Sequence, residues 1–155
     1  MPFLWPYLLL LIPAVPLVRD DFGTRRVAVV WLSALGAGCF GVTWIVSGIG
    51  AAFSCTAINV CLIAVFGAVM ALYQLLLRRP LGDFFTRYFG AGDVAMLAAV
   101  APLFTPAAYV RFLLAANLAA LGWWAVRRPA TIPLAGFMAL TLSVYVVCKT
   151  AGLWS

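Results

Sequence analysis

Histidine and glutamate are absent from this 155-residue sequence, and its single lysine is Lys149. Without histidine, the chain has no Ser-His-Asp triad, no Cys-His pair and no HExxH zinc site. A serine–lysine pair would have to use Lys149, and no motif surrounds that residue. Any acid–base chemistry of side-chain carboxylates therefore depends on four aspartates: Asp20, Asp21, Asp83 and Asp93.

Charge of either sign is scarce, because 9% of the residues are charged and 66% are hydrophobic. About 25% of the residues are charged in an ordinary soluble domain, so that class is excluded. A membrane span needs about 20 apolar residues, which leaves room for roughly six spans. The apolar stretches are continuous rather than alternating, which favours helices over a barrel. We expect an all-α, polytopic membrane bundle of about six transmembrane helices, with residues 1–155 forming a single domain.

Proline, glycine and arginine divide the sequence into six apolar segments. We expect spans at about residues 2–18, 27–48, 53–77, 92–104, 107–126 and 132–153. The first segment lacks a basic start, so we interpret it as a retained span and not as a signal peptide. A short turn around Gly50 precedes the third segment and Pro80 follows it, while Pro102 and Pro106 are expected to bend or end the fourth. Between these two segments, an interfacial helix is predicted from the helical spacing of Phe84, Phe85, Tyr88 and Phe89.

The basic residues lie mainly on one side of the predicted bundle. Eight of them fall in the first, third and fifth loops: Arg19, Arg25, Arg26, Arg78, Arg79, Arg87, Arg127 and Arg128. The opposite side has only Arg111 and Lys149. The excess marks the cytoplasmic side, so both termini are predicted on the non-cytoplasmic side. We interpret the net charge of +6 as an orientation signal with attraction to anionic membrane lipid, and expect no nucleic-acid partner.

Topology places two of the aspartates at the same depth. Two predicted spans separate Asp21 from Asp93, and an even number of crossings returns the chain to the same face. Their adjacency further requires the second and fourth spans to pack together. Two neighbouring carboxylates share a proton, so one can deprotonate a water while the other donates to a carbonyl. This is the chemistry of an aspartic protease, and it needs no metal or cofactor.

Other roles are open to each aspartate. Asp20 and Asp21 lie in an arginine-rich segment, where either is suited to a solvated ion pair. Asp83 follows a glycine in a predicted polar turn. Asp93 is suited to capping the fourth span, a role that is compatible with catalysis. The four cysteines form no CxxC pair and are interpreted as small apolar residues without a disulfide or a metal: Cys39, Cys55, Cys61 and Cys148.

Residues 90–93, Gly-Ala-Gly-Asp, form a GxGD sequence at the start of an apolar segment. This motif resembles that of the GxGD intramembrane aspartyl proteases, which include the type IV prepilin peptidases. Residues 90–99 are similar to the family's GxGDxKLLAA stretch, and residues 21–27 to its first-aspartate segment. Residues 131–137, Thr-Ile-Pro-Leu-Ala-Gly-Phe, are similar to a late IPFGPF-like segment. The three segments occur in the family's order and cover most of the chain.

The resemblance implies that Asp21, rather than Asp20, and Asp93 are the catalytic aspartates. Glycines at 90 and 92 would let backbone or substrate approach closely, so both are candidate substrate-binding positions. The implied activity is endopeptidase cleavage of the basic leader from type IV prepilin-like membrane proteins, without a cofactor. It takes place at the cytoplasmic face of the bacterial inner membrane, which agrees with the charge bias. We expect a small polar cavity lined by both aspartates, with the two glycines at its rim.

The sequence also departs from the family pattern. Ala95 replaces the usual lysine, residues 27–29 replace Ile-Pro-Asn, and Gly136 replaces the second proline of the late segment. The chain has no cysteine-rich cytoplasmic domain, so it resembles the short form that has peptidase but no methyltransferase activity. Two alternatives stay open: a degenerate peptidase retained as a chaperone, and a small transporter or assembly factor. In the latter, three amides either line a polar path or join helices: Asn59, Gln74 and Asn117.

Overall fold

The computed structural model describes residues 5–24, 27–78, 90–128 and 132–152. Within these ranges the regular structure is entirely helical, which confirms the predicted all-α class. The α-helices are α1 Trp5–Leu8, α2 Leu11–Thr24, α3 Val29–Ser47, α4 Ile49–Leu76, α6 Ala91–Val100, α7 Pro106–Arg127 and α8 Leu134–Thr150, and η2 Ala101–Leu103 is a 3-10 helix. The predicted interfacial helix and Asp83 lie outside the described residues.

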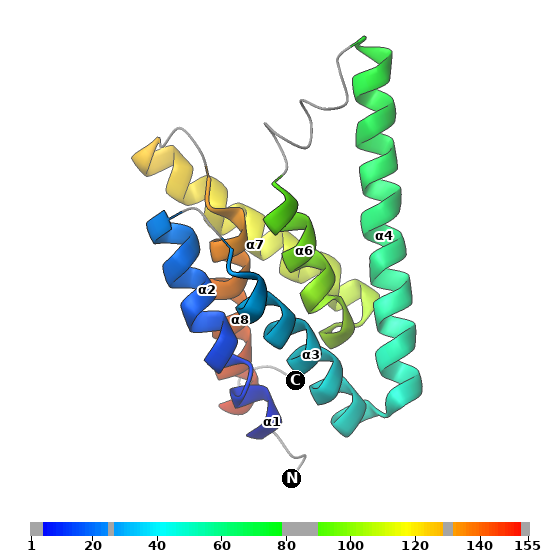
Figure 1. The fold of residues 1–155 in the computed structure, drawn as a ribbon, viewed down its shortest axis with the longest axis vertical. Coiled ribbons are helices and arrows are strands. Elements are labelled where there is room, and N and C mark those ends of the chain that lie inside the picture. The colour runs from blue at the N-terminus through cyan, green and yellow to red at the C-terminus, as the bar shows by residue number, and fades with distance from the viewer. Residues whose placement is uncertain (1–4, 25–26, 79–89, 129–131, 153–155) are drawn as a thin grey trace.

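The helices form an elongated bundle in which α4 stands along one side (Figure 1). Helices α2 and α8 pack closely, as do α7 and α8, while α3 contacts α2, α4 and α6. The described chain begins and ends at the lower end in Figure 1. The last turns of α2, α4 and α7 lie at the upper end, together with the first turn of α6. Alternating helix directions therefore gather several charged helix ends at one end of the bundle.

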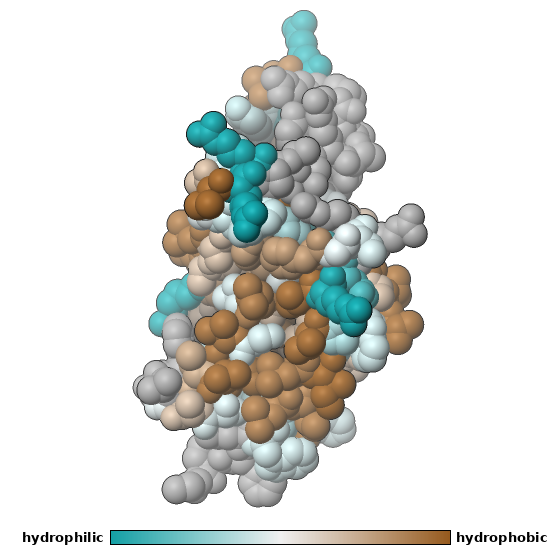
Figure 2. Space-filling model, turned by 90° about the vertical axis from the view of Figure 1, so that its left-hand side faces the viewer, coloured by the Kyte–Doolittle hydropathy of each residue, from teal (hydrophilic) through white to brown (hydrophobic). Residues whose placement is uncertain are grey.

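Three helices are long and apolar enough to cross a membrane: α3, α4 and α7. The fourth predicted span corresponds to the shorter apolar run Ala91–Leu103, and the sixth to α8. Figure 2 shows one face of the molecule, on which hydrophobic residues cover a broad area with few hydrophilic residues between them. An apolar exterior of this extent is suited to lipid rather than to water.

Two helix boundaries differ from the predictions. The third span was predicted from residue 53 after a turn near Gly50, but α4 begins at Ile49. Gly48 alone separates it from α3, with φ of 88°, a conformation that a residue without Cβ adopts at little cost. Pro102 and Pro106 act as expected, because η2 tightens the chain at the first and α7 begins at the second.

The first helical region extends further than predicted. Residues 19–26 were expected to form a charged loop, but α2 continues to Thr24. The Thr24 hydroxyl donates to the Asp20 carbonyl oxygen (2.9 Å), which satisfies one carbonyl near the helix end. Asp21 therefore projects from the last turn of α2 and does not open the second span. This correction matters, because a helix fixes the direction of the side chain more firmly than a loop does.

The core lies where α2, α3, α6 and α8 meet. Its fully buried side chains include Leu10, Leu35, Met96, Val100, Met138 and Leu142. Tyr109 of α7 is also buried there, and its hydroxyl donates to the Leu97 carbonyl oxygen (2.9 Å). This packing holds the last turn of α2 and the first turns of α6 and α8 in fixed relation to one another.

Candidate active site

Asp93 is the third residue of α6, which follows the extended residue Gly90. The backbone N–H of Ala135, in the first turn of α8, donates to Asp93 Oδ1 over 2.9 Å. The Asp93 side chain is half-buried, so the carboxylate lies at the edge of the packed helices. Asp93 thus joins the start of α6 to the start of α8.

Asp21 lies in the last turn of α2 and is 6% exposed. The backbone N–H of Gly136 donates to Asp21 Oδ2 over 2.6 Å. Burial excludes the solvated surface ion pair that the neighbouring arginines suggested for this aspartate. Its neighbour Asp20 is partly exposed, and only its backbone carbonyl takes part in the bond to Thr24 described above.

The two aspartates meet at consecutive backbone N–H groups. Three backbone bonds separate the nitrogens of Ala135 and Gly136, so the bonded oxygens of Asp21 and Asp93 lie within about 10 Å of each other. The two carboxylates also interact electrostatically. Packing between the second and fourth predicted spans was expected to bring them together. Contacts between α3 and α6 exist, but the direct link is the first turn of α8, between α2 and α6.

The start of α8 is suited to this position because the first N–H groups of a helix have no partner within the helix. Pro133 precedes α8 and provides no side-chain cap. The aspartates of α2 and α6 supply the missing acceptors, and their negative charge suits the positive end of the helix dipole. Sequence reasoning did not identify the N–H groups of Ala135 and Gly136, although the Thr-Ile-Pro segment had pointed to this part of the chain.

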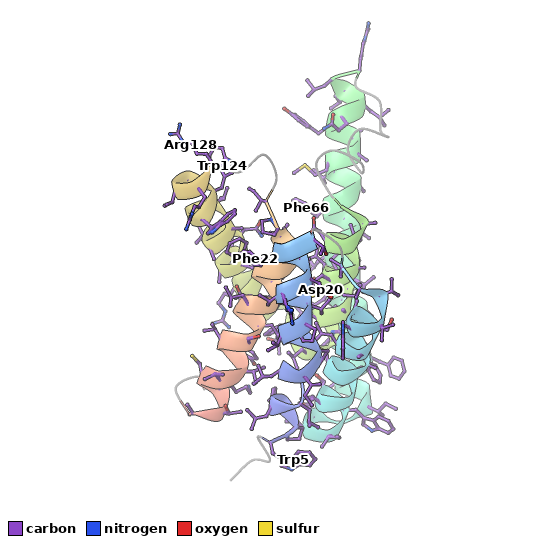
Figure 3. All side chains as sticks on the ribbon, turned by 60° about the vertical axis from the view of Figure 1, so that its left-hand side comes forward. Trp5, Asp20, Phe22, Phe66, Trp124 and Arg128 are labelled. Carbon is purple, nitrogen blue, oxygen red and sulfur yellow. The ribbon has the colours of Figure 1, made fainter. Side chains whose placement is uncertain are left out.

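Aromatic rings gather around Phe22, the residue that follows the buried aspartate. The Phe22 ring lies 5.1 Å from the Phe137 ring and 6.1 Å from the Trp123 ring, measured between centroids. Figure 3 shows Phe22 at the upper end of α2, near the end of α7 that carries Trp124 and Arg128. A Cβ at Gly136 would lie 2.8 Å from Phe22 Cε2 and 3.0 Å from Asp21 Oδ2. The close approach of α8 to α2 therefore requires glycine at position 136.

The two glycines of the GxGD sequence have different surroundings. A Cβ at Gly90 would lie 3.4 Å from Asp93 Oδ2, so Gly90 is next to the carboxylate. A Cβ at Gly92 would lie 3.0 Å from Val27 Cγ2. The close approach at Gly92 is thus made by a residue of the chain itself. Substrate contact at Gly90 and Gly92 stays a prediction.

The polar cavity expected at the aspartates stays a prediction, and two hollows in the described part of the chain lie elsewhere. One hollow lies between α7 and α8, around Phe112 and Tyr145, and a larger one adjoins α4. Neither is lined by Asp21 or Asp93. Within the same residues, no cluster of three His, Cys, Asp or Glu side chains offers a metal site.

Two of the three amides considered for a polar path donate to backbone carbonyl oxygens. Asn59 of α4 is fully buried, and its Nδ2 donates to the carbonyl oxygens of Ala101 and Phe104, over 2.8 Å each. Asn117 Nδ2 donates to the Leu113 carbonyl oxygen within its own helix (2.8 Å). These bonds favour the helix-joining interpretation for Asn59 and a local one for Asn117.

No protein-family model, no curated protein and no solved structure matches this chain. The resemblance to the GxGD proteases therefore rests on the three short segments. Each of these segments contributes to the site: the first supplies Asp21, the second supplies Asp93, and the third supplies the N–H groups of Ala135 and Gly136.

Proposed function

We propose that this protein is an intramembrane aspartyl endopeptidase that removes the basic leader from type IV prepilin-like membrane proteins. One observation carries the proposal: Asp21 and Asp93, far apart in the sequence, accept hydrogen bonds from neighbouring N–H groups of α8. Their proximity, in a chain without histidine or glutamate, supports acid–base chemistry by a carboxylate pair.

In the proposed reaction, the ionised carboxylate takes a proton from a water, and the resulting hydroxide attacks the scissile carbonyl carbon. The protonated carboxyl donates its proton to the carbonyl oxygen, which gives a tetrahedral diol. The diol then collapses, the C–N bond breaks, and the amine leaves with a proton from the pair. In the proposed reaction the N–H groups of Gly136 and Ala135 hold one oxygen of each carboxylate in place, Oδ2 of Asp21 and Oδ1 of Asp93.

The proposed setting is the bacterial inner membrane, with several crossings and the aspartates near the cytoplasmic boundary. Water reaches a boundary site without a deep channel. Arg78 lies two residues beyond the end of α4 and Arg127 is the last residue of α7. Both helices end at the same end of the bundle as the first turn of α6, which supports a cytoplasmic position for that end. In this orientation both termini are on the non-cytoplasmic side.

A second candidate is a non-enzymatic membrane protein on the same fold, such as an assembly factor or a degenerate peptidase. The observation that favours it is that both carboxylates join helices, and Asp21 is almost fully buried. In this role the aspartates only need to accept hydrogen bonds. Asparagine also offers a carbonyl oxygen acceptor, so the two candidates differ in their response to asparagine.

The test is cleavage of a purified prepilin-like substrate by Asp21→Asn and Asp93→Asn in lipid vesicles. The proposal predicts folded variants whose cleavage rates fall by about 10²–10⁴-fold, because an amide does not transfer protons in place of a carboxyl. Asp20→Asn is the matched control and is expected to cleave at the wild-type rate. Full activity in either Asp21→Asn or Asp93→Asn would reject the peptidase and leave the non-enzymatic candidate.

A further inference from the structure

An apolar hollow of about 720 Å³ lies between α4 and the rest of the bundle. Residues from Leu62 to Val69 line its α4 side, and α6, α7 and α8 line the other side. Asn59 attaches α4 to η2, and beyond Asn59 no described residue of α4 is buried. Figure 1 shows the upper part of α4 standing apart from its neighbours. We call this hollow the α4 groove.

Two residues that line the α4 groove are sequence neighbours of residues at the aspartate pair. Val94 lines it and directly follows Asp93 in α6. Leu134 also lines it and directly precedes Ala135, whose N–H bonds to Asp93. Neither aspartate lines the groove itself, but the first turns of α6 and α8, which the bond between Ala135 and Asp93 joins, also form part of its wall. An occupant of the groove would have one end near Asp93.

The lining of the α4 groove selects an apolar occupant. Its two polar side chains, Tyr109 and Asn117, already donate to backbone carbonyls of Leu97 and Leu113. The remaining lining residues are apolar, and none is charged. A charged or strongly polar ligand would lose its hydration here without gaining partners. A segment with leucine, valine or isoleucine side chains has no polar groups there to dehydrate, so it does not have this cost.

The dimensions of the groove suit a helix. A helix is about 10–12 Å across and rises about 5.4 Å per turn, so 720 Å³ holds roughly one to two turns. Gly67 lies in the lining, and a Cβ built there meets no atom within 4 Å. A small residue on an otherwise bulky helix face lets a second helix approach closely within a membrane.

We propose that the α4 groove seats the apolar transmembrane helix of the peptidase substrate, with the leader junction of that helix at Asp93. This inference rests on the proposed function and adds where the substrate lies. A helix entering between α4 and α7 does so sideways from the lipid. The groove thereby selects substrates by their apolar helix, and the aspartate pair acts on the adjoining leader.

The first test fills the groove. Gly67→Leu places a side chain in open space, so the protein is expected to fold, while cleavage of a prepilin-like substrate falls about tenfold or more. Gly41→Leu is the matched control, because Gly41 also lies within a helix with nothing near its would-be Cβ and does not line the groove. Cleavage by the control is expected to stay within about twofold of wild type, and equal cleavage by both variants overturns the inference.

The second test does not depend on cleavage. A benzophenone amino acid replaces Phe66 in the groove or, as the control, Ile45 on the exposed face of α3, both in the Asp93→Asn background. In vesicles of phosphatidylethanolamine and phosphatidylglycerol, the Phe66 position is expected to cross-link to the apolar helix of the prepilin-like substrate, and the Ile45 position is not.

The two tests separate the two proposals. Cross-linking at Phe66 without cleavage by the wild-type protein would support the α4 groove and reject the peptidase. Wild-type cleavage together with full activity of Gly67→Leu would reject the groove and leave the peptidase. Cross-links from Phe66 to lipid alone, or to a second copy of this chain alone, would overturn the groove as a substrate site.

Discussion

Gly136 combines two properties that no other residue type offers at this position. It has no Cβ, which lets Phe22 and Asp21 approach, and it has an N–H, which Asp21 accepts. The late family segment that residues 131–137 resemble has a proline at this position, and proline has no N–H to donate. The hydrogen bond from α8 to Asp21 therefore depends on Gly136, a residue at which the chain departs from the family pattern.

Replacing Gly136 with alanine is expected to lower the free energy of unfolding by about 1–3 kcal/mol, because the new Cβ overpacks against Phe22 and Asp21. Thermal unfolding in detergent micelles measures the change. Gly23→Ala is the matched control, because a Cβ there meets nothing within 4 Å. A Gly136→Ala protein as stable as the Gly23→Ala protein would show that α8 does not approach Phe22 and Asp21 as closely as described.

The aspartates could be singled out from the sequence because the choice of acids is so small. With four carboxylates and a GxGD sequence, Asp21 and Asp93 follow from topology and resemblance together. Their hydrogen-bond donors could not be singled out. A backbone N–H belongs to every residue except proline, so Ala135 and Gly136 become distinctive only once α8 is placed against α2 and α6.

The buried side-chain amide of Asn59 holds helix α4 against η2. The Nδ2 of Asn59 donates to the carbonyl oxygens of Ala101, the first residue of η2, and Phe104, the residue after it. Asn59→Leu would remove both bonds while keeping a side chain of similar size. We expect a loss of about 1–3 kcal/mol in the free energy of unfolding, because buried carbonyls lose their donor.

The control for that variant is Asn117→Leu. Asn117 is exposed and donates only within its own helix, so its replacement is expected to change the unfolding free energy by less than about 0.5 kcal/mol. Thermal unfolding of both proteins in the same detergent decides the question. Equal stability of the two variants would mean that Asn59 does not hold α4 to η2.

Helix boundaries were predictable where proline or a change in polarity marks them. Helices α3 and α7 were predicted to within two residues, and Pro106 begins α7. The end of α2 was not predictable, because residues 19–24 are polar and resemble a loop. They stay helical because the Gly136 N–H donates to Asp21 and the Thr24 hydroxyl donates to the Asp20 carbonyl. Gly136 is 115 residues from Asp21 in the sequence, so a local pattern does not reveal this bond. The break at Gly48, rather than Gly50, depends on a positive φ that either glycine can adopt.

The arrangement of the bundle makes the orientation testable. The ends of α2 and α7 lie together at the end opposite to the described termini (Figure 1). In a protein whose native cysteines are replaced by alanine, we expect Gly23→Cys and Arg128→Cys to react with a membrane-impermeant thiol reagent from the cytoplasmic side only. Ser47→Cys and Ala151→Cys are expected to react only from the other side. Labelling of all four positions from one side would contradict the alternating topology.

The most direct measurement of the aspartate pair is a double-mutant comparison in the cleavage assay. Catalytic groups that act as a unit are non-additive, so removing either one costs nearly as much as removing both. If the two aspartates act as a unit, Asp21→Asn, Asp93→Asn and the double variant are all expected to cleave a prepilin-like substrate at the same residual rate. Losses that multiply in the double variant, or a single variant with wild-type cleavage, would contradict a shared catalytic role for Asp21 and Asp93.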